Sequence, residues 1–472
     1  MDNPIKAILF GAGARGADAY GPYALDHPDQ IQFIAVAEPN KPRRESFAAE
    51  HAIPEEFRFE TWEQALEQRL PANVVINCTQ DQMHAESSIP ALQAGYDLLL
   101  EKPIAHSLKD AISIIRAAEQ TGQYLQVCHV LRYTDFFKTV KSLLDEQRLG
   151  QVISITHREN VASWHMAHSY VRGNWRSKEQ SSPMILAKCC HDLDLLVWFV
   201  GEAPQMVSSF GSLSHFKSEN APQGAPERCT DGCPVENSCP FYAPAIYIDL
   251  IPFKFALSQS RIPLYKFIGN QSLKHPKTIQ AISRAIPQLR ELTNYKGWPR
   301  SVVSDNPGSE ESLLKALQEG PYGRCVYHCD NDVVDHQDVS MEFPSGITAT
   351  LTMQGHSHEE GRTLRIDGSQ ASLLAKFSFH RAFIEIHDHR SLEVELIEFP
   401  STVEQTGHGG GDYGVMRDFV TNILDLGSTV HSARESLESH FMAFAAEESR
   451  LNNTTIDMAE FRKDPEGMAS TP

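Results

Sequence analysis

Short apolar runs alternate with amphipathic stretches over the first 130 residues. Nearly every position in these runs is apolar, which is typical of parallel strands buried on both faces of a sheet. They predict strands at 7–10, 33–37, 74–77, 97–100 and 124–127. Apolar residues at helical spacing predict a covering helix over 107–120. The pattern indicates a doubly wound parallel α/β domain over residues 1–130.

The pattern changes after residue 150. A longer strand is expected at 152–156 and a helix at about 182–199, ending at Gly201. Residues 337–397 alternate apolar and polar positions, as in a sheet with one solvent-facing side. Helices are predicted at 412–426 and 433–452, followed by a polar tail over 461–472. Residues 131–460 are therefore predicted to form an α+β domain on a mostly antiparallel, open-faced sheet.

A separate segment at about 215–330 interrupts this second domain. It is rich in proline and contains five of the nine cysteines. Between Arg261 and Arg300 the chain has eight basic residues and a single acidic one, Glu291. Two interpretations explain this excess of basic residues. They form a solvated helical face or subunit contact, or they line a binding site for an acidic ligand.

Composition excludes several classes of protein. The 472 residues include 42 Lys and Arg against 61 Asp and Glu, a formal net charge of −19 that repels nucleic-acid phosphates. No apolar run approaches the roughly 20 residues that a membrane span requires. The first residues lack a basic export signal, so a cytoplasmic chain with reduced thiols is expected, with neither membrane nor nucleic acid as partner.

A glycine-rich motif, Gly-Ala-Gly-Ala-Arg-Gly, directly follows the first predicted strand. In such a turn the first glycine permits the bend, the second lets the backbone approach a pyrophosphate, and the third allows close helix packing. Glu38 ends the second strand and is suited to holding a ribose 2′-hydroxyl, which favours NAD over NADP. Arg43 and Arg44 lie close behind and could soften that preference. The cofactor residues in this region are Gly11, Gly13, Ala14, Arg15, Gly16 and Glu38.

Two further motifs lie at the carboxyl ends of predicted strands, where open α/β sheets bind ligands. Thr79 and His84 follow the third strand, and Glu101-Lys102-Pro103 follows the fourth. We expect Thr79, His84 and Glu101 to face the cofactor. A lysine at this edge can donate to a substrate hydroxyl or carry its proton.

These motifs, with Arg132-Tyr133 and His191-Asp192-Leu193-Asp194, resemble the glucose–fructose oxidoreductase / inositol dehydrogenase / rhizopine-catabolism (Gfo/Idh/MocA) family. The similarity covers about residues 5–212 and 332–452. It implies a Rossmann domain, an open-faced sheet domain, and a homodimer or homotetramer. It also implies NAD(P)-linked hydride transfer at a carbinol of a carbohydrate or cyclitol, and a cis peptide before Pro103.

The resemblance identifies His191 as the catalytic base, a role that suits imidazole near neutral pH. The family's usual aspartate four residues earlier is replaced here by Ala187, which puts the family's proton relay in doubt. We predict a catalytic pair of Lys102 and His191, with Lys188 as a proton partner. A structural pairing of His191 with Asp194 is the alternative.

The stretch 159–176 is too polar and aromatic for a core and suits sugar hydroxyls. The predicted substrate residues are Arg132, Tyr133, His165, Arg172, Trp175 and Arg176. The glycines at 407–411 either let the backbone approach a substrate or form a mobile connection. The predicted function is NAD-dependent oxidation of a secondary hydroxyl of a sugar, sugar acid or polyol. The alternatives are an NAD-dependent glycosidase or lyase that oxidises a ring hydroxyl transiently, and a non-catalytic dinucleotide sensor.

Five cysteines are clustered in the interrupting segment: Cys229, Cys233, Cys239, Cys325 and Cys329. Four thiolates around a structural zinc would stabilise a segment that buries little apolar surface. Their spacing differs from the common Cys-x2-Cys, so an iron–sulfur cluster, free thiols or disulfides remain open.

Overall fold

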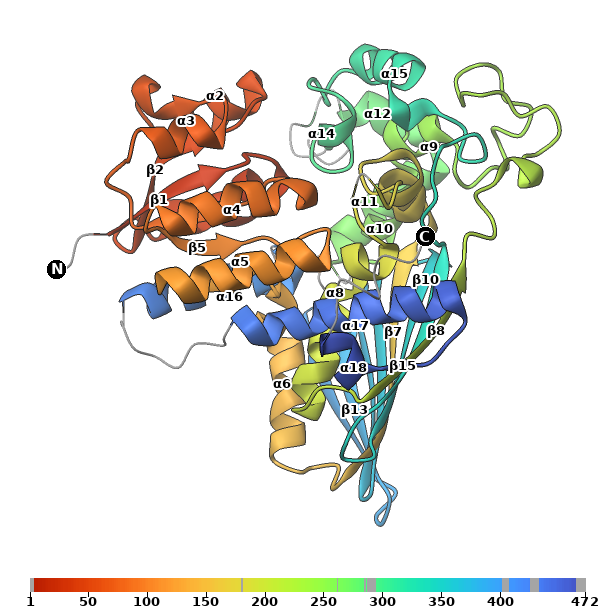
Figure 1. The fold of residues 1–472 in the computed structure, drawn as a ribbon. Coiled ribbons are helices and arrows are strands. Elements are labelled where there is room, and N and C mark those ends of the chain that lie inside the picture. Colours follow the sequence, from red (N-terminus) through yellow and green to blue (C-terminus); the bar gives the residue numbers. More distant parts are fainter. Residues whose placement is uncertain are drawn as a thin grey trace.

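The computed structural model describes residues 4–179, 181–260, 262–283, 286, 294–400, 407–424 and 433–463. It contains two sheets, a six-stranded one in the N-terminal part and a nine-stranded one that follows it (Figure 1). The predicted combination of a doubly wound Rossmann domain with an α+β domain is confirmed.

The first sheet is entirely parallel, in the order β3-β2-β1-β4-β5-β6. Its strands are β1 (Ile5–Phe10), β2 (Ile31–Ala37), β3 (Arg58–Phe59), β4 (Val74–Asn77), β5 (Asp97–Leu100) and β6 (Leu125–Val127). All five predicted strands are present. Strand β3 was not predicted, because two residues are too few to show a period.

Helices cover both faces of this sheet. They are η1 (Ala14–Tyr20), α1 (Gly21–Asp26), α2 (Lys41–Glu50), η2 (Glu55–Phe57), α3 (Trp62–Glu67), η3 (Asp81–Met83), α4 (His84–Gln93) and α5 (Leu108–Thr121). The Ser107 hydroxyl accepts the Asp110 N–H and caps α5, which therefore begins within one residue of its predicted start.

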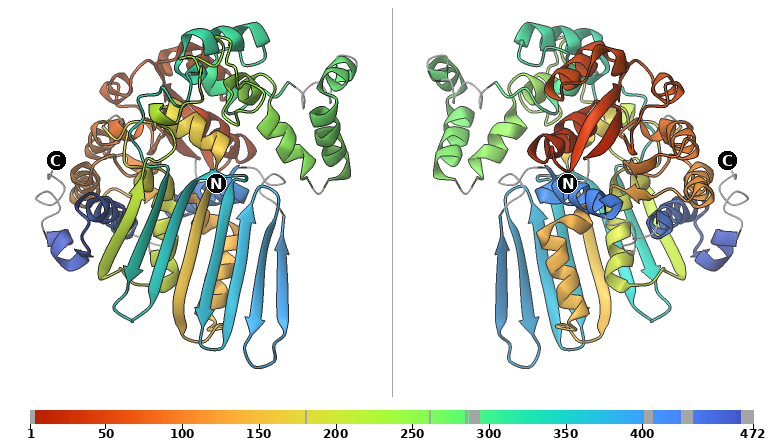
Figure 2. Two further views of the ribbon diagram at one scale, coloured as in Figure 1. Left: turned by 90° about the vertical axis from the view of Figure 1, so that its right-hand side faces the viewer. Right: turned by 90° about the vertical axis from the view of Figure 1, so that its left-hand side faces the viewer.

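The second sheet has the order β14-β13-β12-β11-β7-β10-β9-β8-β15, and only β7 and β10 pair in parallel. Its strands are β7 (Val152–Ala162), β8 (Met206–Ser212), β9 (His336–Glu342), β10 (Thr348–Ser357), β11 (Gly361–Gly368), β12 (Ala371–Ser378), β13 (Ala382–Asp388), β14 (Val394–Phe399) and β15 (Ile456–Asp457). Figure 2 shows helices behind one face and the other face open, as the alternating pattern predicts.

Helices before, between and after the strands of this sheet complete the core. They are η4 (Val130–Tyr133), α6 (Asp135–Asp145), α7 (Ser163–His165), η5 (Met166–Arg172), α8 (Met184–Val200), α16 (Gly407–Leu424), α17 (Ala433–Asn452) and α18 (Met458–Lys463). Helix α16 packs its apolar side chains against the Rossmann core rather than the second sheet. The predicted polar tail begins too early, because residues 461–463 belong to α18 and Phe461 is fully buried. The rest of the predicted tail lies outside the described residues. The same is true of residues 425–426, the predicted end of the helix at 412–426.

The segment between β8 and β9 combines short helices with long irregular stretches and stands beside the Rossmann domain (Figure 1). Its elements are η6 (Ser218–Asn220), α9 (Ala243–Tyr247), α10 (Ile251–Ser258), α11 (Pro263–Lys274), α12 (Pro276–Ser283), α14 (Arg300–Val303), α15 (Glu310–Glu319) and η7 (Pro321–Gly323). Across the described parts of the chain, none of the helices has the length and apolar character needed to cross a membrane.

Candidate active site

The glycine-rich loop between β1 and η1 has the geometry of a dinucleotide cradle. Gly11 has φ of 86°, and a Cβ there would lie 2.6 Å from the Cys78 carbonyl oxygen. A Cβ on Gly16 would lie 2.2 Å from the Gly11 oxygen, so the third glycine lets helix and strand pack closely. A Cβ on Gly13 would meet no atom within 4 Å. The middle of the loop is thus open, where a pyrophosphate would need to approach the backbone.

Glu38, directly after β2, faces this loop. Its carboxylate accepts the N–H of Ala12 at 2.8 Å and that of Asn40 at 2.9 Å. The side chain is 6% exposed, so it supports the loop as well as standing at the predicted ribose position. Arg44 is buried behind Glu38, and its guanidinium donates to the Glu38 backbone oxygen at 2.5 Å.

The predicted cofactor residues after β4 stabilise that edge of the sheet. Thr79 donates its hydroxyl to Asn77 Oδ1 at 2.8 Å. His84 is fully buried, and its ring nitrogens lie 2.8 Å from the Pro103 oxygen and 3.2 Å from the Thr79 oxygen. His84 therefore joins the two loops at the carboxyl ends of β4 and β5.

Arg15 connects the glycine-rich loop to two carboxylates. Its Nε donates to Glu101 Oε1 at 2.5 Å, and its Nη2 donates to Asp412 Oδ1 at 2.7 Å. Although burial opposes ionisation, the Arg15 guanidinium helps hold the pKa of both carboxyls below their usual values. The cluster thus joins residues from opposite ends of the chain around the nucleotide-binding loop.

Lys102 lies at the carboxyl end of β5. The peptide between Lys102 and Pro103 is cis, as the resemblance implied. The lysine N–H donates to Glu101 Oε2 at 2.9 Å, and its ammonium donates to the Ala187 carbonyl oxygen on α8 at 3.1 Å. Lys102 therefore reaches the position where the family pattern has an aspartate.

His191 lies next to Lys102 and is 5% exposed. Burial, followed by the positive charge of Lys102, lowers the pKa of His191 well below its ordinary value. Among the described residues, no group hydrogen-bonds to its buried Nδ1. Two more histidine rings flank it, His129 at 5.8 Å and His408 at 6.4 Å between centroids. A neutral imidazole beside a cation is able to accept a proton from a substrate.

His408 and its partner Asp412 belong to the glycine-rich start of α16. His408 Nδ1 lies 3.2 Å from the Asp412 carboxylate and 3.2 Å from Arg15 Nη1. The His408 side chain is 45% exposed, whereas Asp412 is buried. Sequence reasoning missed both residues, and the glycines at 407–411 were the one signal that pointed to this segment.

Lys188, predicted as a proton partner, is held between two carboxylates. Its ammonium lies 2.8 Å from Glu360 Oε1 and 3.1 Å from Glu159 Oε1. Against the effect of burial, these carboxylates raise the pKa of Lys188. Arg362 continues the buried network by pairing with Glu159 at 2.9 Å and with Asp192 at 2.7 Å. The network ties α8 to the second sheet and keeps Lys188 protonated.

Two predicted substrate residues lie in a row of aromatic rings from the sheet edge to the interrupting segment. Trp175 donates its indole N–H to Asp81 Oδ2 at 3.1 Å, just after β4. The distance between ring centroids is 6.2 Å for Trp175 and Tyr170, 6.0 Å for Tyr170 and His165, and 5.0 Å for His165 and Trp298. Such a row offers stacking faces and polar edges to a sugar.

The other four predicted substrate residues have partners within the fold. Arg132 makes two hydrogen bonds to Asp194, at 2.6 and 2.7 Å. The Tyr133 hydroxyl donates to Asp418 Oδ2 at 3.0 Å. Arg176 donates to Asp330 and Arg172 to the carbonyl oxygens of Phe241 and Arg324. The fully buried Arg172 holds the interrupting segment together.

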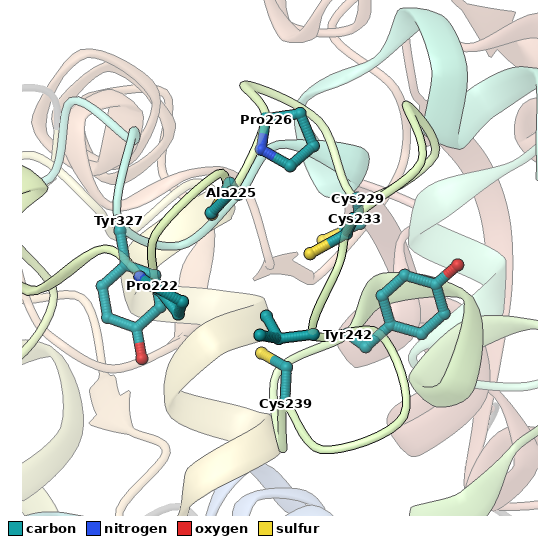
Figure 3. A pocket seen from close by; sticks show the side chains of 10 residues that line it. Pro222, Ala225, Pro226, Cys229, Cys233, Cys239, Tyr242 and Tyr327 are labelled. Atoms are coloured by element: carbon teal, nitrogen blue, oxygen red, sulfur yellow. The ribbon is translucent and has the colours of Figure 1, made fainter.

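The cysteines of the interrupting segment gather around one pocket (Figure 3). Cys229, Cys233, Cys239 and Cys325 line it, and the Cys329 thiol donates to the Cys325 carbonyl oxygen at 3.3 Å. All nine cysteines are free. Within the described residues no group of three or more His, Cys, Asp or Glu side chains could hold a metal. The structural-zinc prediction is therefore not supported.

The sequence matches two family models. The Gfo/Idh/MocA model described as "Oxidoreductase family, NAD-binding Rossmann fold" covers residues 5–129, and its companion, "C-terminal alpha/beta domain", covers residues 141–242. Together they span the glycine-rich loop, the Glu101-Lys102-Pro103 motif and helix α8.

Curated relatives share part of this chain. It is 28% identical to scyllo-inositol 2-dehydrogenase (NADP(+)) IolW of Bacillus subtilis, over 37% of this chain and 46% of that protein. It is 26% identical to 2,7-anhydro-N-acetylneuraminate hydratase of Escherichia coli, over 30% of this chain and 37% of that protein. The chain thus spans less than half the length of each.

A solved structure shares the whole fold. The levoglucosan dehydrogenase complex with NADH and levoglucosan superposes with a TM-score of 0.63 and 16% identity, over 97% of this chain and all of that one. At this identity the match shows the architecture.

Proposed function

Because this chain belongs to the Gfo/Idh/MocA family of NAD-binding oxidoreductases, we propose that it oxidises a secondary hydroxyl of a sugar, sugar acid or polyol. The observation that carries the proposal is the position of Lys102 beside the buried, neutral His191. Lys102 follows β5, at the edge of the Rossmann sheet that also bears the open glycine-rich loop, and His191 lies beside it on α8. A base, a cation and a nucleotide cradle are what such an oxidation needs.

NAD is the cofactor that fits these residues. Gly11, Gly13 and Gly16 form the cradle, and Glu38 disfavours a 2′-phosphate by its negative charge. Bound NAD supplies the acceptor for the hydride that leaves the carbinol carbon. The scyllo-inositol dehydrogenase relative uses NADP according to its name, so the preference needs direct measurement.

The protein side of the chemistry concerns the hydroxyl proton. Lys102 stabilises the developing alkoxide through its positive charge, and His191 accepts the proton. Lys188 is assigned a positioning role, since its paired ammonium with a raised pKa is a poor proton carrier.

His408 is the proposed exit for that proton. It lies between buried His191 and solvent, and it is oriented by Asp412. With Nδ1–H donated to Asp412, Nε2 is free to receive the proton through a bridging water. His408 and Asp412 thereby take over the relay that Ala187 cannot provide.

The proposed substrate wall is the aromatic row that contains His165 and Trp175. The substrate contacts by Arg132, Tyr133, Arg172 and Arg176 stay predictions. Their side chains have partners within the fold, as those of His165 and Trp175 also do. The cytoplasmic location and the homodimer or homotetramer remain predictions.

The similarity to a hydratase favours one second candidate function. The same residues would then remove and return a proton while a ring hydroxyl is oxidised transiently. In that case elimination or hydration replaces net oxidation. Lys102 and His191 serve either reaction, so only product analysis distinguishes them.

The deciding experiment incubates the purified protein with NAD or NADP and a panel of polyols, free sugars, sugar acids and aryl glycosides. Stoichiometric NADH from a free sugar or polyol supports the dehydrogenase. Aglycone release or hydration without net NADH, lost when bound nucleotide is removed, supports the second candidate. The Glu38→Ser variant should shift the ratio of kcat/KM values toward NADP. If no substrate yields either signal and no nucleotide binds, the proposal fails.

A further inference from the structure

Helices α10, α11 and α12 form a helical arm, residues 251–283, that stands away from both sheets. In both views of Figure 2 these helices project from one side of the molecule. At the base of the arm, Phe253 stacks on Tyr295 at 4.5 Å, and Phe255 meets His380 edge-on at 5.9 Å. The arm is therefore attached at one end and uncovered over much of its length.

The packing within the arm leaves its large side chains outside. Helices α10 and α11 cross at Gly269, where a Cβ would lie 2.3 Å from the Ser258 backbone nitrogen. The residues buried at the crossing are Leu257, Ser258, Gly269 and Ser272, of which only Leu257 is large. The two backbones approach closely because the residues between them are small. The bulky apolar side chains of the arm are therefore not buried at this crossing.

Exposed apolar side chains are concentrated on this arm and the residues just beyond it. Of the twenty large apolar residues that are exposed in the described part of the chain, nine lie between positions 251 and 286. Leu264 and Phe267, one helical turn apart on α11, are 62% and 61% exposed. The other seven are Ile251, Phe255, Ile262, Tyr265, Leu273, Ile282 and Ile286. Such a concentration of exposed apolar side chains on one segment indicates an interaction surface.

The charge of the segment identifies the partner. Residues 250–290 contain seven basic residues and no acidic one, a charge of +7, and the rest of the chain then carries −19 − 7 = −26. Lys266 and Lys274 are exposed on α11 itself. A basic, apolar surface on an otherwise strongly acidic protein is complementary to another copy of the same protein.

We propose that the helical arm docks onto the acidic body of a second copy of this chain. The apolar stripe of Leu264 and Phe267 supplies the buried contact, and Lys266 and Lys274 steer the encounter. An anionic membrane is the other surface that a basic, apolar arm could meet, and the vesicle experiment below distinguishes it from a second copy. The proposal concerns an intersubunit surface and does not depend on the reaction proposed above.

Association of full-length variants tests the apolar contact. Sedimentation velocity over a range of concentrations should show at least a tenfold higher dissociation constant for Leu264→Glu with Phe267→Glu than for the wild type. Leu451→Glu is the matched control, since Leu451 is also helical and 50% exposed but lies on α17. Unchanged association of the arm variant, or an equal loss in the control, overturns the proposal. Circular dichroism confirms that each variant is folded.

Cross-linking locates the contact. A mixture of ¹⁴N- and ¹⁵N-labelled protein is treated with a zero-length carbodiimide, which joins lysines to carboxylates in direct contact. The arm has no carboxylate of its own, so Lys266 and Lys274 must react with residues outside it. Mixed-isotope links from these lysines, decreasing as salt rises from 50 to 500 mM, support the proposal. Links within one isotope only, or arm-dependent co-sedimentation with phosphatidylglycerol vesicles without self-association, refute it.

Discussion

At the scale of single residues, the proposed reaction depends on a neutral His191. Burial is the largest cause of its lowered pKa, and the nearby Lys102 ammonium is the next. Both disfavour the imidazolium, so the ring stays an acceptor at pH values where an exposed histidine would already be protonated. In the proposed reaction the neutral ring is therefore available as the base, and the Lys102 ammonium is available to stabilise the alkoxide.

This electrostatic arrangement predicts an unusual pH profile. For wild-type oxidation, kcat/KM should remain level as pH falls through 6.5 and decline only below it. Lys102→Met removes a positive charge beside His191. That variant should lose roughly 10²–10⁴-fold in rate, and its acid limb should move to higher pH. Stopped-flow or steady-state NADH formation between pH 5 and 9 measures both effects.

His358, whose side chain is 83% exposed, provides the control as His358→Asn. It should reproduce the wild-type curve. An acid limb in Lys102→Met that coincides with the wild-type limb would show that the lysine does not control the base.

At the scale of elements, two glycines of the six-residue loop 11–16 are expected to have different roles. One is needed for the fold and the other for nucleotide binding. Gly16 is required by the packing of η1 against β1, because any Cβ would meet the Gly11 carbonyl oxygen at 2.2 Å. Gly13 has a negative φ of −81° and open space around it, so the fold tolerates alanine there. Glycine is thus expected at these two positions of one turn for two different physical reasons.

A matched pair of variants tests this separation. Gly16→Ala should lower the free energy of unfolding by roughly 1–3 kcal/mol through the backbone clash. Gly13→Ala should change it by less than about 0.5 kcal/mol yet weaken NAD binding at least tenfold, because the methyl group occupies the approach to the pyrophosphate. Urea denaturation and isothermal titration calorimetry give the two quantities. Identical behaviour of the pair would contradict the assignment.

At the scale of the whole molecule, a buried histidine joins the two domains beneath the site. His440 of α17 accepts the Ile104 N–H at 2.8 Å, just beyond Pro103, although the residues are 336 positions apart. Burial lowers the pKa of His440 to about 3. The contact requires the neutral ring, so it couples domain packing to pH.

The sign of this coupling is set by the lowered pKa. As pH falls below about 6.5 the unfolded chain binds a proton at this histidine and the folded chain does not, so stability is lost. His440→Gln keeps an acceptor for Ile104 but does not titrate. Between pH 7 and 5, the free energy of unfolding of the wild type should fall by roughly 2 kcal/mol more than that of the variant.

Urea denaturation at both pH values measures the difference, and the other titrating groups cancel between the two proteins. His358→Gln should keep the wild-type slope. Parallel pH dependence of His440→Gln and the wild type would remove His440 from the domain contact.

The sequence by itself determined the two-sheet architecture, the four longest predicted helices and the position of the glycine-rich loop, whereas the catalytic pair of Lys102 and His191 stays a prediction. Strand and helix periods, glycine spacing and the position of a motif after a strand are local properties, so they can be read along the chain. The family resemblance added the role of His191 and the cis peptide before Pro103. The cysteine spacing, in contrast, suggested a zinc site that the described residues do not form.

Only the tertiary structure decided which polar groups share the site. Arg15 and Asp412 lie 397 positions apart, and their ion pair exists because α16 returns to pack on the Rossmann core. The same return brings His408 next to His191. Arg172, in contrast, is buried and donates to the Phe241 carbonyl oxygen of the interrupting segment. The spacing of residues along the chain carries no information about such distant pairs. Burial and the partners available to each charge, which determine its pKa and role, arise only when the domains pack together.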